Sequence, residues 1–446
     1  MKHYHIWTIG CQMNVADSQR VGSALEHLGY SHTEQIEAAD VIVMNTCVVR
    51  QSAEDKAYGR LSSLKPLKQK NPKLIINLMG CLVGVRGYEK LKATFPYVDV
   101  FSPPSDPGPL ISLLTQGEIR SLEDAETTRR FIAMDEELIL PAAERGNLVS
   151  AHVPIVYGCS HACTFCIIPY KRGIERSRPV GDIVSEVRAL AAQGVVEITL
   201  LGQIVDRYGK DIPDGPNLAA LLKLVSAVDG IQRVRFLTSH PNYFGEELIQ
   251  AIASLPKVMP HIELPIQAGD DTVLKNMHRG YTQQDYRDIV AKIRAEIPGC
   301  SIATDIIVGF PGETEEDFEE TRALMEAARF DNAFIFKYSP REGTPAAQWE
   351  DDVPEEEKLR RNHALLRDQD RRGLALNQAL VGQTVAVLAE GPSLRNKARW
   401  SGRTTGNKIV IFEPRPGLLA GDIISVAIER AAAQTLYGPL MDGQKA

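Results

Sequence analysis

The sequence predicts a multidomain α/β protein whose three parts are built differently. Residues 1–120 alternate short apolar runs with helix-like stretches, which is typical of a parallel sheet covered on both faces by helices. Residues 145–375 repeat this alternation six times, as expected for a partial (β/α)6 TIM-like barrel. Residues 378–443 contain short strands between Gly, Pro and Asn, which indicates a small antiparallel, OB-like β-barrel.

The first part is predicted to be a flavodoxin-like domain with a parallel sheet. Its strands are short, apolar and partly β-branched: HYHIWTIGC (3–11), VIVMNTC (41–47) and KLIINLMGC (73–81). Apolar residues at helical spacing predict a helix from Asp17 to Leu28 between the first two strands. Residues 121–150 are charged and weakly periodic, which favours a linker or crossover.

Six further strands are expected in the second part, each followed by a helical or loop segment. They are 152–159, 196–202, 233–239, 261–267, 301–310 and 332–340. A charged stretch from Glu355 to Arg372 predicts a solvated helix that leads to the last part.

Composition excludes several classes of protein. The 446 residues carry a formal net charge of −7, which argues against a uniformly basic nucleic-acid binder. The sequence contains no apolar run long enough for a membrane span, and its start lacks the apolar core of a signal peptide. We therefore expect a cytoplasmic protein with no membrane partner. The odd number of cysteines, seven, argues against a disulfide framework and leaves thiols for metal binding.

The strongest local signal is GCSHACTFCIIPY, which places Cys159, Cys163 and Cys166 in C-x3-C-x2-C spacing. A 4Fe-4S cube normally takes four thiolates, so three would leave one iron open to a small molecule. The loop follows the first barrel strand, at the end where barrel enzymes place their chemistry. A structural zinc site with His161 as fourth ligand, or three inert cysteines, are the alternatives.

A second group of cysteines ends successive strands of the first domain. Cys11, Cys47 and Cys81 each close one predicted strand, and the carboxyl ends of parallel strands share one edge of a sheet. Helix N-termini near this edge would favour the thiolate form. This arrangement predicts a second 4Fe-4S cluster with an open iron. The alternative is that these are small buried residues.

Other candidate pocket residues follow the barrel strands or flank the C-x3-C-x2-C loop. Aromatic side chains beside the loop would keep water from the cluster, glycines would allow close backbone approach, and polar side chains would bind a small cofactor. The predicted cofactor-binding residues are Gly202, Gln203, Gln267, Tyr157, Phe165 and Arg178. The alternatives are turn or cap roles for Gly202, Gln203 and Gln267, and a surface ion-pair cluster for Arg178.

The last part carries a local basic cluster. Arg395, Lys397, Arg399 and Arg403 flank Trp400, although the whole chain is acidic. Basic side chains bind phosphates while an aromatic ring stacks on a base, so this segment is predicted to bind RNA.

In this order and combination, the motifs resemble the radical S-adenosylmethionine (SAM) methylthiotransferases. The matching motifs are IGCQMN, VMNTCVVR, LMGC, GCSHACTFCIIPYKRGIERSRP, LLGQ, LPIQAGDD, DIIVGFPGET, SPREGTPAA and, near the end, GRT with KIVIF. The chain is most similar to the tRNA-modifying, MiaB-type branch, and its last part resembles a TRAM domain. The resemblance implies two 4Fe-4S clusters, SAM as cofactor, a low-potential electron donor of flavodoxin or ferredoxin type, and a sulfur source.

The implied reaction places a methylthio group on C2 of N6-isopentenyladenosine next to the anticodon of tRNA. One SAM would methylate sulfur on the first-domain cluster, and a second SAM would supply the radical that removes hydrogen from C2. Alternative substrates are N6-threonylcarbamoyladenosine and a ribosomal-protein aspartate. Alternatives outside this class are a non-catalytic iron–sulfur RNA-binding protein and a zinc-stabilised binding module.

One short segment departs from the family pattern. After LLGQ the tRNA branch commonly continues with Asn-Val-Asn, whereas this chain has Ile204, Val205 and Asp206. Because the segment follows a barrel strand, the departure lies where SAM or substrate is expected.

Overall fold

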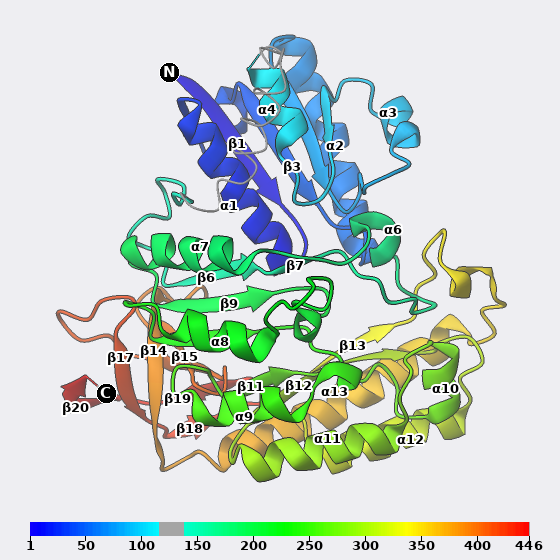
Figure 1. Cartoon of the computed structure of the whole chain (residues 1–446), viewed down its shortest axis with the longest axis vertical. Coiled ribbons are helices and arrows are strands. Elements are labelled where there is room, and N and C mark those ends of the chain that lie inside the picture. Colours follow the sequence, from blue (N-terminus) through cyan, green and yellow to red (C-terminus); the bar gives the residue numbers. More distant parts are fainter. Residues whose placement is uncertain (116–137, 446) are drawn as a thin grey trace.

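The computed structural model describes residues 1–115 and 138–445. The first domain, blue to cyan in Figure 1, contains the predicted parallel sheet. Its strand order is β2-β1-β3-β4-β5. Each pairing in the sheet is parallel. The strands are β1 (Lys2–Thr8), β2 (Tyr30–His32), β3 (Val41–Thr46), β4 (Ile75–Gly80) and β5 (Val100–Ser102).

Helices cover both faces of this sheet because β3 alternates its apolar side chains between two cores. Val41 and Val43 belong to a core that includes residues of α1, whereas Ile42 and Met44 belong to a core that includes residues of α2. The helices are α1 (Gln12–His27), α2 (Gln51–Lys70), α3 (Glu89–Thr94) and α4 (Gly108–Leu114), with a short turn η1 (Ile36–Ala38). The helix predicted from Asp17 to Leu28 corresponds to α1, which begins earlier, at Gln12.

All six predicted strands of the second part are present, arranged as two three-stranded parallel sheets, β10-β9-β6 and β11-β12-β13. Their bounds are β6 (Ser150–Pro154), β9 (Glu197–Leu201), β10 (Arg233–Phe236), β11 (His261–Glu263), β12 (Ser301–Val308) and β13 (Asn332–Lys337). This is the partial barrel that the sequence predicts.

The helices of the barrel pack on its outer face around one large apolar core. They are α7 (Val180–Ala192), α8 (Leu218–Ser226), α9 (Glu246–Ser254), α10 (Asp271–Asn276), α11 (Gln283–Glu296) and α12 (Glu315–Ala328). Short turns η3 (Val205–Arg207), η4 (Pro241–Tyr243) and η5 (Pro345–Gln348) follow β9, β10 and β13. The loops after the strands therefore form the mouth of the barrel.

A small hairpin carries the loop with the C-x3-C-x2-C cysteines toward the first domain. It pairs β7 (Val156–Tyr157) with β8 (Arg176–Ser177), and α6 (Ile168–Arg172) lies between them in sequence. Figure 1 shows α6 between the first domain and the barrel. The backbone N–H of Val85 donates to the carbonyl of Lys171, so this helix is bonded directly to the first domain.

Helix α13 (Glu355–Gln378) leads to a seven-stranded sheet of order β18-β19-β16-β15-β14-β17-β20. The sheet is antiparallel as predicted, except that β16 and β19 run parallel. Its strands are β14 (Thr384–Pro392), β15 (Trp400–Thr404), β16 (Ile409–Phe412), β17 (Ile423–Ala427), β18 (Arg430–Ala431), β19 (Thr435–Tyr437) and β20 (Leu440–Lys445).

The last sheet packs against the amino ends of the barrel strands, away from the mouth. Arg233 at the start of β10 donates to the carbonyl of Arg403 at 2.8 Å, and Arg235 donates to the carbonyl of Thr404 at 2.8 Å. Both arginines are buried by this contact. The sheet is thus an integral part of the molecule.

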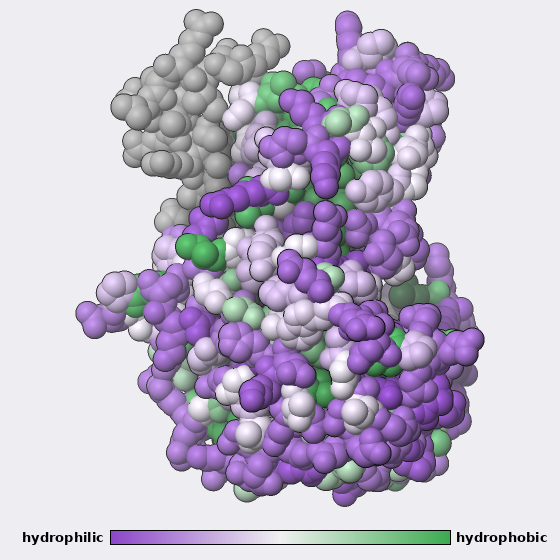
Figure 2. Space-filling view, turned by 90° about the vertical axis from the view of Figure 1, so that its right-hand side faces the viewer, coloured by the Kyte–Doolittle hydropathy of each residue, from purple (hydrophilic) through white to green (hydrophobic). Residues whose placement is uncertain are grey.

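Most of the predicted linker 121–150 lies outside the described residues, and the boundaries 1–120, 145–375 and 378–443 stay predictions. Among the described helices, none is both long and apolar enough to cross a membrane. Figure 2 shows a mostly hydrophilic face, with a recess that contains hydrophobic surface between its upper and lower parts.

Candidate active site

The cysteines of the first domain lie on three loops that approach one another closely. Cys11 is the N-cap of α1, Cys47 follows β3 and Cys81 follows β4. Gly10 has φ +143°, and a Cβ there would lie 2.9 Å from the Cβ of Cys47. Gly80 has φ +97°, and a Cβ there would lie 2.4 Å from the carbonyl oxygen of Thr46. Glycine precedes two of the cysteines because larger residues would separate the loops.

Asn14 joins two of these loops. Its Nδ2 donates to the carbonyl of Ile9 at 3.1 Å and to the carbonyl of Thr46 at 3.0 Å. Its Oδ1 accepts from the thiol of Cys11 at 3.6 Å. Asn14 is fully buried, so these bonds position Cys11 against the end of β3.

Cys81 is the most deeply embedded of the three. Burial raises the pKa of its thiol to about 11, the Arg172 guanidinium opposes this, and the proximity of Cys11 and Cys47 adds to it. The expectation that a helix N-terminus favours its thiolate is wrong, because α3 begins only at Glu89. Instead, Arg172 Nε donates to Cys81 Sγ at 3.2 Å.

The second group of cysteines lines a cavity of about 160 Å³ at the mouth of the barrel. Cys159 and Cys163 are buried and Cys166 is half-buried. Burial raises the pKa of Cys159 to about 11 and that of Cys166 to about 12. The backbone N–H of His161 donates to Cys159 Sγ at 3.5 Å, and Arg279 donates to Cys163 Sγ at 3.5 Å.

Much of the remaining wall of this cavity comes from the loops after three barrel strands and from one strand residue. The loops after β9, β10 and β11 contribute Gln203, Ile204, Thr238, Ser239, His240, Pro265 and Gln267, and strand β12 contributes Asp305. Of the predicted cofactor-binding residues, Gln203, Gln267 and Phe165 line the cavity. Gln267 has φ +77°, and its backbone bonds β12 through Asp305 and Ile307.

The other three predicted cofactor-binding residues stand outside the lining. The Tyr157 hydroxyl accepts a hydrogen bond from Arg20 of α1. Arg178 is buried, donates to the carbonyl of Pro154 at 2.6 Å and pairs with Glu186 at 2.7 Å. Gly202 is constrained by packing, since a Cβ there would lie 3.1 Å from the Cα of Val205.

Burial favours the neutral forms of two histidines and one carboxyl at the mouth. It lowers the pKa of His240 to about 2 and that of His161 to about 4. It raises the pKa of Asp206 to about 7, although this carboxyl accepts from the backbone N–H of His240 at 2.9 Å. His161 bonds the hydroxyl of Tyr243 at 2.8 Å, so its ring is engaged away from the cysteines.

In the part of the chain that the structure describes, no three His, Cys, Asp or Glu side chains form a compact site for one metal ion. A cubane differs, since each of its thiolate ligands binds a separate iron. Donors directed at sulfur fit this role, because hydrogen bonds to cluster ligands tune the metal. Arg279 donates a hydrogen bond to Cys163 Sγ, and Arg172 donates one to Cys81 Sγ. The backbone N–H of Val49 donates to Cys47 Sγ at 3.4 Å.

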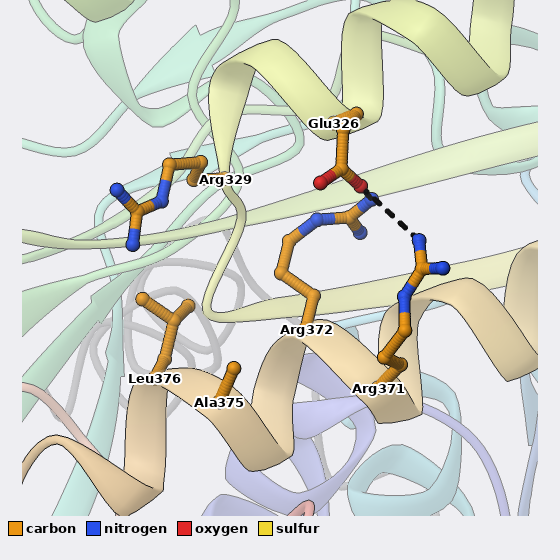
Figure 3. Close-up of a pocket in the computed structure, with 6 residues that line it drawn as sticks. All are labelled: Glu326, Arg329, Arg371, Arg372, Ala375 and Leu376. Carbon is orange, nitrogen blue, oxygen red and sulfur yellow. Dashed lines mark hydrogen bonds and ion pairs between the residues drawn. The ribbon is translucent and has the colours of Figure 1, made fainter.

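A second cavity, of about 410 Å³, lies between the end of α12 and α13 (Figure 3). It is lined by Glu326, Arg329, Arg371, Arg372, Ala375 and Leu376. Glu326 accepts from Arg371 at 3.4 Å and from Arg372 at 2.9 Å. This cavity lies at the amino ends of the barrel strands, because Arg329 comes just before β13 in the chain. No cysteine lines it.

Comparison with protein families assigns each of the three parts. Residues 153–325 match the radical SAM superfamily, residues 3–102 match the uncharacterized protein family UPF0004, and residues 378–441 match the TRAM domain. Similarity to curated proteins extends over the whole chain.

A tRNA-2-methylthio-N(6)-dimethylallyladenosine synthase of Moorella thermoacetica is 44% identical, over 99% of each chain. A Roseiflexus protein of the same name is 46% identical over 98% of this chain and 90% of its own. The chain belongs to the MiaB-type radical SAM methylthiotransferase family. The radical SAM part implies one 4Fe-4S cluster and SAM.

Among solved structures, this methylthiotransferase shares its fold with TsrM of Kitasatospora setae, a radical SAM methyltransferase with cobalamin and a [4Fe-4S] cluster bound. The TM-score is 0.55 at 13% identity, covering 78% of this chain and 77% of that one. Likeness at this level concerns the fold alone.

Sequence reasoning missed three residues of the methylthiotransferase site. Asp305 gave a signal, because it is a lone charge in the apolar strand SIATDIIV. Asn14 lies in the IGCQMN motif, but its hydrogen bonds reach from the end of one strand to the end of another. Arg279 follows α10 in a turn and gave no signal of its own.

Proposed function

We propose that this chain is a tRNA methylthiotransferase that places a methylthio group on C2 of N6-isopentenyladenosine, also called N6-dimethylallyladenosine, next to the anticodon. The observation that carries the proposal is that the helix directly after the second cysteine group contacts the first cysteine group across the domain boundary. Cys81 of the first group and Arg172, which follows the loop of the second, are in hydrogen-bond contact. Full-length similarity to synthases of this name supports the substrate.

The proposed metal ligands are the two cysteine groups, each holding one 4Fe-4S cluster by three thiolates. Cys159, Cys163 and Cys166 would hold the radical SAM cluster, and Cys11, Cys47 and Cys81 the second. When bound, the former cluster supplies the electron that cleaves SAM, and the latter carries the sulfur that is transferred.

The chain's own residues bind, orient and shield these groups. Gln203 and Gln267 would bind polar groups of SAM, since both line the cavity with the second cysteine group. Phe165 lies edge-on to Phe310 at 6.4 Å and closes the cavity toward the apolar core. Burial lowers the pKa of His161 and His240, so these two side chains offer hydrogen bonds to a bound cofactor without adding charge.

The proposed partners follow from this chemistry. Reductive cleavage of SAM needs a low-potential electron donor of flavodoxin or ferredoxin type, and each turnover consumes sulfur that a sulfur source must replace. tRNA is the substrate, and the TRAM domain is a second contact for it. We place the reaction in the cytoplasm, where such tRNA substrates are found.

Nucleoside mass spectrometry of tRNA tests the proposal. Cells lacking this protein should accumulate N6-isopentenyladenosine, and the intact gene should restore the 2-methylthio derivative. Restoration by the wild-type chain but by neither Cys47→Ala nor Cys163→Ala is the expected result. A methylthio group that appears on N6-threonylcarbamoyladenosine instead would overturn the substrate assignment.

A further inference from the structure

Strand β13 exposes a large aromatic side chain in an unusual place. Phe334 is 44% exposed, whereas its neighbours Ala333 and Ile335 are 8% and 9% exposed. Side chains alternate along a strand, and Ala333 and Ile335 pack into the core beneath the helices. Phe334 therefore points to the opposite, concave face of the partial barrel.

The register of the sheet places this ring beside the cavity that contains the second cysteine group. Phe334 pairs with Asp305 of β12, and Phe336 pairs with Ile307. Ile306 and Val308, on the alternate face of β12, are fully buried in the helix-covered core. Asp305 lines the cavity, and neighbouring strands lie about 4.8 Å apart, so Phe334 borders the same space.

The first cysteine group reaches the same strand from the other side. Arg50, in the loop that follows Cys47, lies over the ring of Phe336 at 5.1 Å. Arg341, after β13, donates to Gln51 at 2.9 Å and pairs with Glu54 at 3.6 Å, which fixes the start of α2 there. The concave face of β13 thus lies between the loops of the two cysteine groups.

We propose that Phe334 is the stacking platform for the target adenine and its apolar N6 substituent, a specificity-determining contact of this enzyme. This inference rests on the proposed function. Enzymes that act on a base must take it out of its stack, and single-stranded bases stack on aromatic rings. An adenine on Phe334 would present its C2 edge between the two cysteine groups, and Arg50 would lie near the flanking phosphate.

The test uses the full-length, cluster-loaded enzyme under anaerobic conditions. The substrates are anticodon stem-loop RNAs with N6-isopentenyladenosine or plain adenosine at the target position. Phe334→Ala should raise KM for the isopentenylated RNA by about 5- to 150-fold, the range that base–aromatic stacking provides. SAM cleavage without RNA should be unchanged, which shows that the variant is folded and loaded. Phe334→Tyr, which keeps the ring, should stay close to wild type.

Leu359→Ala is the matched control, because Leu359 on α13 is 43% exposed and lies outside the concave face. Phe334→Leu separates stacking from apolar area and should resemble Phe334→Ala. A KM for Phe334→Ala equal to that of Leu359→Ala, while wild type makes product, would overturn the inference alone. If wild type makes no methylthio product from either RNA, the proposed function falls and the inference with it.

Discussion

The guanidinium of Arg172 contacts Cys81 across a sequence separation of 91 residues. The same side chain donates to Asn14 Oδ1 at 2.9 Å and lies 3.8 Å from the carboxylate of Asp17. Arg172 ends α6, the helix that follows the C-x3-C-x2-C loop. One buried arginine therefore couples the positions of both cysteine groups.

Replacing Arg172 should destabilise the protein strongly. Arg172→Met leaves Asp17, which is fully buried, without its cation, and breaking a buried pair typically costs about 3–5 kcal/mol. Chemical denaturation of the cluster-free protein measures this destabilisation, with the exposed Arg176→Met as control. A destabilisation no larger than that of the control would show that Arg172 does not hold the two domains together.

The two cysteine groups should separate two activities. Cys163→Ala should abolish 5′-deoxyadenosine formation, because the radical SAM cluster loses one of its three proposed ligands. Cys47→Ala should retain SAM cleavage but stop sulfur insertion into RNA. Product chromatography measures both, and iron analysis gives the cluster content of each variant.

Cys300→Ala is the control for these variants, since Cys300 is buried in the outer core and outside the cavity. It should keep both activities at near wild-type iron content. Full sulfur insertion by Cys47→Ala would make the first cysteine group structural rather than metal-binding.

Asp206 should make stability fall as pH rises. Its pKa is raised from 3.8 to about 7, chiefly by burial, so between these values the folded state binds a proton that the unfolded state has lost. Stability then decreases with pH by up to about 1.4 kcal/mol per unit in this window. Asp206→Asn, which removes the titrating carboxyl, should flatten this slope and be more stable than wild type at pH 8.

Unfolding free energies between pH 4.5 and 8 test this prediction, and the exposed Asp229→Asn provides the control. Parallel curves for wild type and Asp206→Asn would mean that Asp206 titrates alike in the folded and unfolded states.

The sequence predicted the elements and the cysteine groups because both follow local rules. Strand periodicity located all six barrel strands, and the rule that parallel strands share one edge predicted the meeting of Cys11, Cys47 and Cys81. Side-chain partners do not follow such rules. Tyr157 and Arg178 flank the cysteine loop in sequence, yet they bond Arg20 and Glu186. Only the packing of α1 and α7 against the hairpin decides this.

The sequence also did not predict where the TRAM domain packs on the barrel. This packing changes how the basic cluster must be tested. Deleting residues after 378 would expose the buried Arg233 and Arg235, which both donate to TRAM carbonyls. Trp400 packs partly against the domain's own core, and Arg403 is engaged by Glu390 at 3.1 Å. The basic side chains that stay exposed in the loop before β15 include Arg395 and Lys397.

Arg395→Ala combined with Lys397→Ala should therefore weaken tRNA binding without unfolding the domain. Removing one phosphate-binding side chain should reduce the slope of log affinity against log salt by about 1, so the double variant should reduce it by up to about 2. Lys65→Ala with Lys73→Ala, both exposed in the first domain, removes the same charge elsewhere. If both double variants change the salt slope equally, the effect comes from net charge, and the RNA is bound by another surface.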